Sequence, residues 1–141
     1  MLVSFCVIAY NEEKALDSLF KDIIAQDYPH GNIEVILVNA MSTDQTRRKM
    51  EHFSEEDHGF RRVVVLDNAK KIQAAGWNVA ITASKGDIIL RIDAHTMIPH
   101  DFVSKNVQCI LSGENVTGGR RPNVVEEETY IVVGRIFYVW K

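Results

Sequence analysis

The sequence predicts an α/β domain with a mostly parallel four-stranded sheet and helices on both faces, and two observations support this. Short apolar runs typical of buried strands alternate with segments in which apolar residues recur every three or four positions. Turn residues separate the two kinds of segment. This alternation favours parallel strands joined by right-handed crossovers. If the fourth strand crosses to the far side of the first, the strand order is 3-2-1-4.

The first half of this pattern begins with an almost unbroken apolar run over residues 3–9, which predicts a strand covered on both faces. A helix should follow with Asn11 as its N-cap, because the apolar residues between 16 and 24 fall on one helical face. Residues 33–38 predict the second strand.

The next strand and helices follow from capping and spacing. Ser42 and Gln45 have the spacing of a capping box, so a helix is expected from there to about Glu55. Residues 62–66 predict a third strand, and small and apolar residues predict a helix over 72–84.

The last part of the chain starts with a predicted fourth strand at residues 88–92. Pro99 is expected to open a helix that closes at Gly113. We also expect a strand over 115–121 and a last helix over 126–140.

Composition narrows the function classes. The 141 residues suit one domain, and a net charge of −3 with scattered basic residues argues against a nucleic-acid partner. No apolar stretch reaches the length of a membrane span, and the first residues are interpreted as a strand and not as a signal peptide. Cys6 and Cys109 lack metal or redox spacing, so we expect buried, reduced thiols in a cytoplasmic protein.

The candidate site lies where Asp93, Ala94 and His95 follow the fourth strand. The 3-2-1-4 order makes the first and fourth strands neighbours at a topological switch point, where ligands bind at the carboxyl ends of strands. Residues 9–12 would then lie beside Asp93, and residues 39–42 would form the next wall. Such a crevice favours a nucleotide.

Asp93 and His95 are candidate metal ligands, because alternate residues of an extended chain point the same way. Their oxygen and nitrogen ligands suit Mg²⁺ or Mn²⁺, which would neutralise a departing diphosphate. An isolated Asp-x-His is more often a turn cap followed by a surface histidine, and the rest of the chain is what favours a metal site. The sequence has neither Gly-x-Gly-x-x-Gly nor a Gly-Lys-Ser/Thr phosphate loop, which argues against dinucleotide oxidoreductases and P-loop hydrolases.

Several motifs, in this order along nearly the whole chain, resemble those of the family 2 glycosyltransferases, which have the Rossmann-like GT-A fold. They are Val-Ile-Ala-Tyr-Asn-Glu-Glu at 7–13, Gln-Asp-Tyr-Pro at 26–29, the segment 34–46, Ala-Gly-Trp-Asn-Val-Ala at 75–80 and Lys-Gly-Asp at 85–87. Arg-Ile-Asp-Ala-His-Thr at 91–96, with Gly-Gly-Arg-Arg-Pro at 118–122, is similar to the branch that includes the succinoglycan exopolysaccharide glucosyltransferases.

The resemblance implies an inverting glycosyltransferase that moves a sugar from a nucleotide diphosphate donor to a hydroxyl of a saccharide or lipid-linked acceptor. Asp93 and His95 stand where the family's Asp-x-Asp motif holds Mn²⁺ or Mg²⁺, with His95 in place of the second acid. The donor-binding residues that it implies are Ala9, Tyr10, Asn11, Glu12, Asn39, Ala40, Lys71, Gln73, Asn78, Asp93 and Ala94.

One departure bears on the base. The family usually has an acidic pair after the second strand that contacts uracil, and this chain has Asn39-Ala40. Asn39 carries no charge and can also donate, but it can still accept a hydrogen bond from a ring N–H, so a UDP-sugar stays the default donor. Lys70, Lys71 and Gln73 fall where the family can place a basic contact to the nucleotide, although lysines at a helix start are more often simply solvated.

The resemblance leaves the general base unidentified, because the family places that acid in the acceptor-binding half, beyond these residues. We therefore expect the N-terminal donor half of a longer bacterial enzyme of polysaccharide synthesis. We expect a cytoplasmic protein that associates with the inner face of the plasma membrane through a C-terminal part. A homodimer is a further expectation. Two alternatives stay open: a catalytically inactive nucleotide-binding or interaction module, and a sugar-phosphate nucleotidyltransferase. The latter normally has a Gly-rich basic loop after its first strand, unlike Tyr10-Asn11-Glu12-Glu13.

Overall fold

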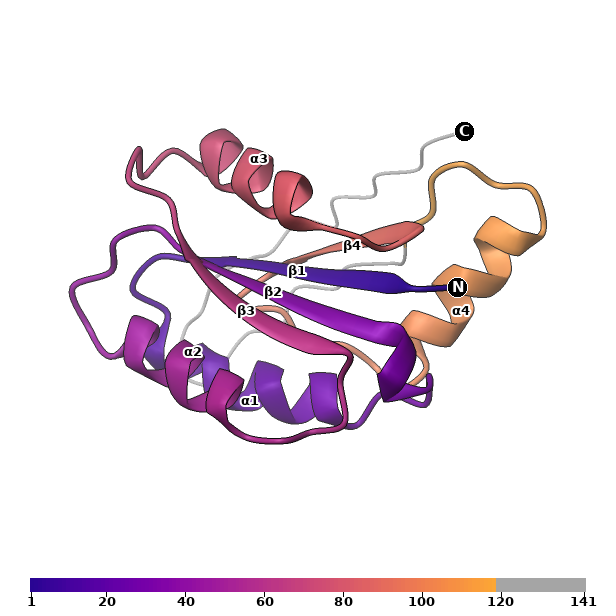
Figure 1. Cartoon of the computed structure of the whole chain (residues 1–141), viewed down its shortest axis with the longest axis horizontal. Coiled ribbons are helices and arrows are strands. Elements are labelled where there is room, and N and C mark those ends of the chain that lie inside the picture. The colour runs from indigo at the N-terminus through magenta and orange to yellow at the C-terminus, as the bar shows by residue number, and fades with distance from the viewer. Residues whose placement is uncertain (119–141) are drawn as a thin grey trace, which may run out of the picture.

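The computed structural model describes residues 1–118 and shows a parallel sheet between helices (Figure 1). The elements in chain order are β1 (Val3–Ala9), α1 (Glu13–Ile24), the short 3-10 helix η1 (His30–Asn32), β2 (Ile33–Asn39), α2 (Thr46–Glu55), β3 (Arg62–Asp67), α3 (Gln73–Ala83), β4 (Ile88–Asp93) and α4 (Phe102–Leu111). The strand order is β3-β2-β1-β4 and all pairs are parallel, which confirms the predicted topology.

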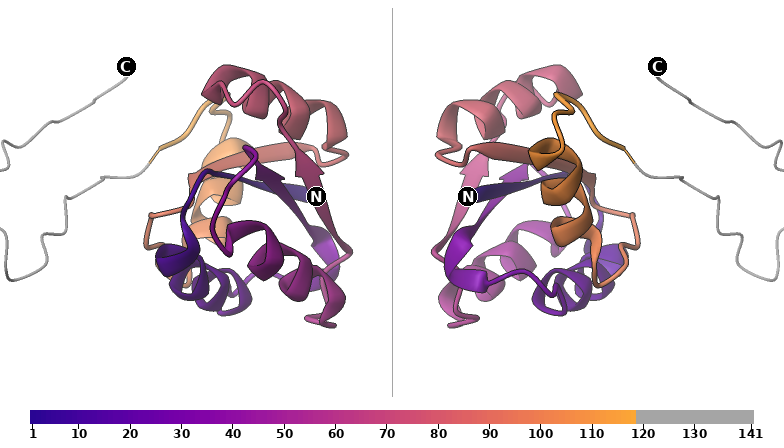
Figure 2. Two further views of the ribbon diagram at one scale, coloured as in Figure 1. Left: turned by 90° about the vertical axis from the view of Figure 1, so that its left-hand side faces the viewer. Right: turned by 90° about the vertical axis from the view of Figure 1, so that its right-hand side faces the viewer.

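The two faces of the sheet carry separate cores. Val3, Phe5 and Val7 of β1 are fully buried on the face that packs against α1, α2 and α4. Helix α3 lies on the other face of the sheet (Figures 1 and 2). There, Cys6 packs with Trp77 of α3. Each fully buried large apolar side chain contributes about 1.5–3 kcal/mol to folding, so both layers hold the strands in place.

Helix α3 does not cover the whole of its face. The side chains of β1 and β2 that point toward α3 are mostly buried, whereas those of β4 on the same face are exposed or half-buried. Cys6 pairs in register with Arg91, and Ile8 pairs with Asp93. Because paired residues of parallel strands point to the same face, Ile89, Arg91 and Asp93 lie on the α3 face beyond the helix.

A buried carboxylate joins the strands near the amino end of the sheet. Glu34 of β2 is 1% exposed and accepts hydrogen bonds from Arg62 Nε at 2.6 Å and from the backbone N–H of Lys85 at 2.5 Å. It also accepts from Ser4 Oγ of β1 and from Gly86 N–H. Burial favours the neutral form, but these hydrogen bonds outweigh it and hold the pKa of Glu34 below its ordinary value.

Both predicted helix caps are wrong. Residue Glu12, and not Asn11, directly precedes α1, and Asn11 adopts a left-handed backbone with φ of 54°. The Ser42–Gln45 capping box does not form either, since α2 begins only at Thr46. Both side chains that were expected to cap locally bond across to the other loop: Ser42 Oγ accepts from Asn11 N–H at 3.0 Å, and Asn11 Oδ1 accepts from Thr43 N–H at 2.9 Å.

The two helix starts instead cap each other. The N–H of Glu12 donates to Thr46 Oγ1 at 2.8 Å, and that of Glu13 donates to Asp44 Oδ2 at 3.2 Å. In return, Gln45 N–H donates to Glu13 Oε2 at 2.9 Å. Orphan donors at the N-termini of α1 and α2 are thus satisfied by tertiary contacts.

Three smaller expectations also differ from the structure. Helix α4 begins at Phe102, after a turn in which Phe102 N–H donates to Pro99 O, so Pro99 is not its first residue. Cys6 is buried as expected, but Cys109 is exposed on α4. Residues 115–118 form no strand, and the remainder of the expected strand and the last helix fall outside the described residues. Between residues 1 and 118, no helix combines the length and apolar character needed to cross a membrane.

Candidate functional site

The predicted site residues gather at the carboxyl ends of the strands. The register places Ala9 opposite Asn39, Asn39 opposite Asp67, and Asp93 opposite Ile8. The last residues of all four strands therefore form one row. The strand order changes direction between β1 and β4, because the chain runs outward from β1 through β2 to β3 and then crosses to the far side of β1. This is the geometry of a topological switch point, where α/β sheets bind ligands.

The wall after β1 is fixed by its contacts with the segment after β2. Ala40 N–H donates to Ala9 O at 2.9 Å, and the bonds of Asn11 to residues 42–43 continue the contact outward. Tyr10 is exposed at the tip of this wall, and Ala40 is buried behind it. Backbone atoms and one aromatic ring thus line this side, a surface that suits a flat base.

Asn39 is brought to the predicted place, but its amide is used within the protein. The side chain is 2% exposed, and Oδ1 accepts from Ser42 N–H at 3.0 Å while Nδ2 donates to Asp67 Oδ1 at 3.1 Å. Asn39 therefore shapes the loop and orients Asp67.

Asp67 was missed by the sequence analysis, although an acid that directly follows an apolar strand is a signal that points to this edge. Its carboxylate is partly exposed at the end of β3 and also pairs with Arg47 of α2. Hydrogen bonds from Arg47 first, and then from Asn39, hold the pKa of Asp67 below its ordinary value. An ionised acceptor consequently lies one strand away from the predicted Asn39.

Asp93 ends β4, and Ala94 and His95 form the turn that follows, closed by a hydrogen bond from Thr96 N–H to Asp93 O at 3.0 Å. Ala94 is buried, which turns its neighbours outward. The imidazole of His95 is 69% exposed, and its Nδ1 lies 3.1 Å from Glu12 Oε1. The structure thus joins two predicted site residues that are 83 positions apart in the sequence.

The fit of a divalent cation rests on the chemistry of these donors. Within residues 1–118, no three His, Cys, Asp or Glu side chains are arranged to enclose a metal ion. A carboxylate and an imidazole supply two ligands that suit Mn²⁺. Because Glu12 faces Nδ1 of His95, Nε2 is the ring nitrogen left for coordination. The residues fit a cation that is shared with the phosphate oxygens of a bound nucleotide.

Arg91 was also missed, and it lies beside Asp93. Its guanidinium carbon is 4.4 Å from the ring centroid of Trp77, and its NH2 nitrogen is 3.9 Å from Asp93 Oδ1. The alternation of β4 puts both side chains on the α3 face. A charged residue in an otherwise apolar strand was the available sequence signal.

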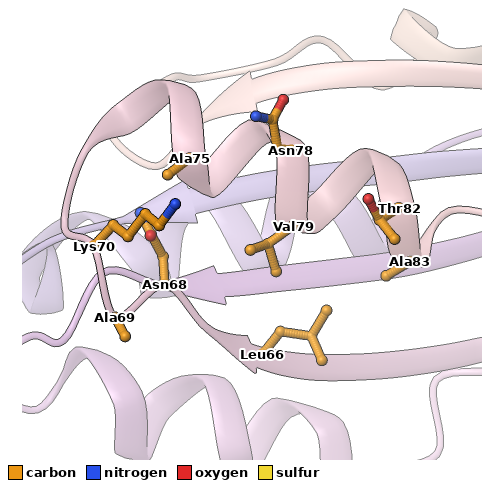
Figure 3. A pocket seen from close by; sticks show the side chains of 9 residues that line it. All are labelled: Leu66, Asn68, Ala69, Lys70, Ala75, Asn78, Val79, Thr82 and Ala83. Atoms are coloured by element: carbon orange, nitrogen blue, oxygen red, sulfur yellow. The ribbon is translucent and has the colours of Figure 1, made fainter.

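The other predicted donor-binding residues, Lys71, Gln73 and Asn78, lie just before α3 or on it. Lys71, with φ of 57°, and Gln73 are exposed at the start of the helix. Asn78 lines a hollow of about 600 Å³ between α3 and β3, together with Lys70 and Leu66 (Figure 3). Neither Asp93 nor His95 lines this hollow.

Comparisons with known proteins bear on the family and the fold of this chain. A family model described as "Glycosyl transferase family 2" matches residues 4–140. One curated relative, the dolichyl N-acetyl-alpha-D-glucosaminyl phosphate 3-beta-D-2,3-diacetamido-2,3-dideoxy-beta-D-glucuronosyltransferase of Methanococcus voltae, is 27% identical over 75% of this chain and 33% of its own length. Succinoglycan biosynthesis protein ExoA of Rhizobium meliloti is 33% identical over 72% of this chain and 30% of its own length.

Among solved structures, mannosyltransferase PcManGT from Pyrobaculum calidifontis, in complex with GDP-Man and Mn²⁺, is similar with a TM-score of 0.70. The sequence identity is 26%, and the match covers 75% of this chain and 31% of that chain. This likeness confirms the predicted GT-A fold. The chain spans about a third of the length of these proteins.

Proposed function

Since this chain belongs to glycosyl transferase family 2, we propose that it holds the donor of an inverting transfer of a sugar from a nucleotide diphosphate to an acceptor hydroxyl. The observation that carries the proposal is the contact between Glu12, after β1, and His95, after β4. It brings the two segments with the clearest site residues together at the switch point, with Asp93 beside them.

Asp93 and His95 would hold Mn²⁺ or Mg²⁺ in this assignment. The bound cation neutralises negative charge on the nucleotide diphosphate as the sugar leaves. PcManGT contains Mn²⁺ together with GDP-Man, which supports a divalent cation in a chain of the same fold. Glu12 orients His95, and Asp93 would supply the charged oxygen ligand.

The base would lie against Tyr10 and the residues at the ends of β1 and β2. Asp67 offers an ionised acceptor for a ring N–H, which Asn39 holds in position by its hydrogen bond of 3.1 Å. Uracil and guanine both carry such an N–H, so UDP stays the default and GDP is the first competitor to test.

The acceptor side is assigned to the part of the protein beyond this chain. A carboxylate there would take the proton from the acceptor hydroxyl as that oxygen attacks the sugar carbon. The names of the Methanococcus and Rhizobium relatives refer to a dolichyl phosphate sugar and to succinoglycan. They support an acceptor that is lipid-linked or part of a growing polysaccharide. We propose the cytoplasmic face of a membrane as the place of the transfer.

The test is calorimetric titration of UDP, GDP and CDP, with and without Mn²⁺, on the full-length protein and on its Asp93→Ala variant. We expect one diphosphate to bind with Mn²⁺ in the micromolar range, and the Mn²⁺ effect to disappear in the variant. Asp57→Ala, which changes an exposed aspartate well before Asp93 in the sequence, is the matched control. Absence of binding for all three nucleotides would refute the proposal.

The same samples separate the alternatives. Slow release of the diphosphate from the matching nucleotide sugar is expected of a transferase. Binding without release, even with added acceptors, would identify an inactive nucleotide-binding module. Release of pyrophosphate from a nucleoside triphosphate and a sugar phosphate would instead indicate a nucleotidyltransferase.

A further inference from the structure

We propose that Arg91, held in place by the indole ring of Trp77, binds the diphosphate of the donor. This inference rests on the proposed function and adds a phosphate contact that the predicted metal ligands do not include. Arg91 and Asp93 lie on the same face of β4 at its carboxyl end, 3.9 Å apart at their nearest charged atoms.

The environment of Arg91 leaves its guanidinium available to a ligand. Its side chain is 54% exposed, although the planar group lies 4.4 Å from the Trp77 ring centroid. An exposed ion pair at the outer distance limit, such as that with Asp93, adds almost nothing to folding. This ion pair therefore does not explain why a charged side chain occupies this apolar strand.

Trp77 has the properties of a platform. It is 8% exposed within the core under α3, and its Nε1–H has no hydrogen-bond acceptor among residues 1–118. Its ring is used by stacking, which favours a guanidinium over an ammonium group. A stacked guanidinium keeps less conformational freedom, so less is lost when it binds an anion.

The charge balance indicates which anion is suitable. Asp93 carries one negative charge, and Arg91 cancels it before any ligand binds. A diphosphate needs more positive charge than one cation shared with a carboxylate supplies. A guanidinium donates two parallel hydrogen bonds to phosphate oxygens, which a metal ion does not replace. Arg91 can thus bind the diphosphate with or without the metal.

The test compares Arg91→Met and Arg91→Lys with Arg48→Met, which changes an exposed arginine on α2. The nucleoside diphosphate that the unchanged protein binds best is titrated, together with its nucleoside, in Mn²⁺ and in EDTA. In EDTA, Arg91→Met should lower the affinity for the diphosphate about tenfold or more, as expected for a lost charge-assisted hydrogen bond, and leave the affinity for the nucleoside unchanged. The diphosphate affinity of Arg91→Lys should lie between those of Arg91→Met and the unchanged protein. Arg48→Met should have the affinity of the unchanged protein.

Trp77→Leu tests the platform. It should lower the affinity for the diphosphate about threefold. The double variant with Arg91→Met should bind the diphosphate no more weakly than Arg91→Met alone, because Trp77 acts only through the Arg91 side chain. Trp77→Phe, which keeps a ring, is expected to restore binding if the leucine variant is unstable.

An unchanged preference for diphosphate over nucleoside in Arg91→Met would overturn the inference while leaving the proposed function intact. Equal weakening of nucleoside and diphosphate would overturn it too, because the role would then be structural. Failure of the unchanged protein to bind any diphosphate would instead refute the proposed function itself.

Discussion

Glu12 Oε1 and His95 Nδ1 lie 3.1 Å apart, and this contact links the loop after β1 to the end of β4. When Nδ1 carries the proton, Glu12 accepts it in a hydrogen bond and the lone pair of Nε2 is free for a metal. The carboxylate thereby fixes both the tautomer and the direction of the ring. This arrangement gives an imidazole the orientation that a ligand needs, although its side chain is 69% exposed.

Glu12→Ala should therefore lower the affinity for Mn²⁺ when the nucleotide is bound. Loss of a carboxylate that orients a metal-bound histidine costs about 10- to 100-fold in metal affinity. Titration of Mn²⁺ into the protein saturated with nucleotide measures this affinity. Glu55→Ala, at the exposed end of α2, is the matched control. Unchanged Mn²⁺ affinity would mean that Glu12 does not act on a metal ligand.

Asp67→Asn should alter recognition of the base and not of the phosphates. An amide keeps one acceptor oxygen but loses the charge, so we expect the nucleoside to bind about tenfold more weakly. The ratio of diphosphate to nucleoside affinity should stay the same, in contrast to Arg91→Met. Calorimetry of both ligands provides this ratio. A change confined to the diphosphate would place Asp67 next to the phosphates instead.

Glu34→Gln should destabilise the fold, most strongly near neutral pH. A glutamine places an amide among N–H donors that now meet a carboxylate, which costs about 1.5–3 kcal/mol in the free energy of unfolding. Because the pKa of Glu34 is lowered on folding, its stabilisation is complete above the ordinary pKa of about 4.5. The difference between the two proteins should shrink as pH falls below that value.

Denaturant unfolding of both proteins at a series of pH values between 3 and 8 checks this dependence. Glu114→Gln, which changes an exposed glutamate, should follow the unchanged protein at every pH. A constant difference down to the acid limit would contradict the role of the Glu34 charge.

Gly86→Ala should be far more damaging than Gly31→Ala. A Cβ at Gly86 would lie 2.5 Å from Ser4 Oγ and 2.6 Å from the Ser4 backbone nitrogen, so the turn before β4 would have to move. Such overpacking costs about 1–3 kcal/mol. A Cβ at Gly31 meets no atom within 4 Å. Thermal unfolding of the two variants should show a clearly lower midpoint for Gly86→Ala only.

The strands were predictable because buried parallel strands are unbroken apolar runs. The 3-2-1-4 order required the further assumption that the fourth strand crosses to the far side of the first, which the structure confirms. The helix starts were not predictable, because Asn11 and Ser42 bond to partners 31 or 32 positions away. A local capping pattern contains no information about such a partner. The sequence predicted that Glu12 and His95 lie at the same edge of the sheet. Their direct contact was not predictable, because it depends on side-chain geometry.

The two missed site residues have the same explanation. Asp67 gains its significance from Asn39 and Arg47, which are 28 and 20 positions away, and Arg91 gains it from the Trp77 ring. Read singly, each is one more charged residue near a strand end. Lys71, Gln73 and Asn78 came from the family resemblance, and their contact with a nucleotide stays a prediction.

The reciprocal caps of α1 and α2 have a consequence for the thermodynamics of binding. Glu13, Asp44 and Thr46 tie the loops after β1 and β2 into one unit before any ligand arrives. A wall that is already ordered loses little conformational entropy when a base is placed against it. The entropic cost of donor binding should therefore fall mainly on the β4 side, where the exposed side chains of Arg91 and His95 become immobilised.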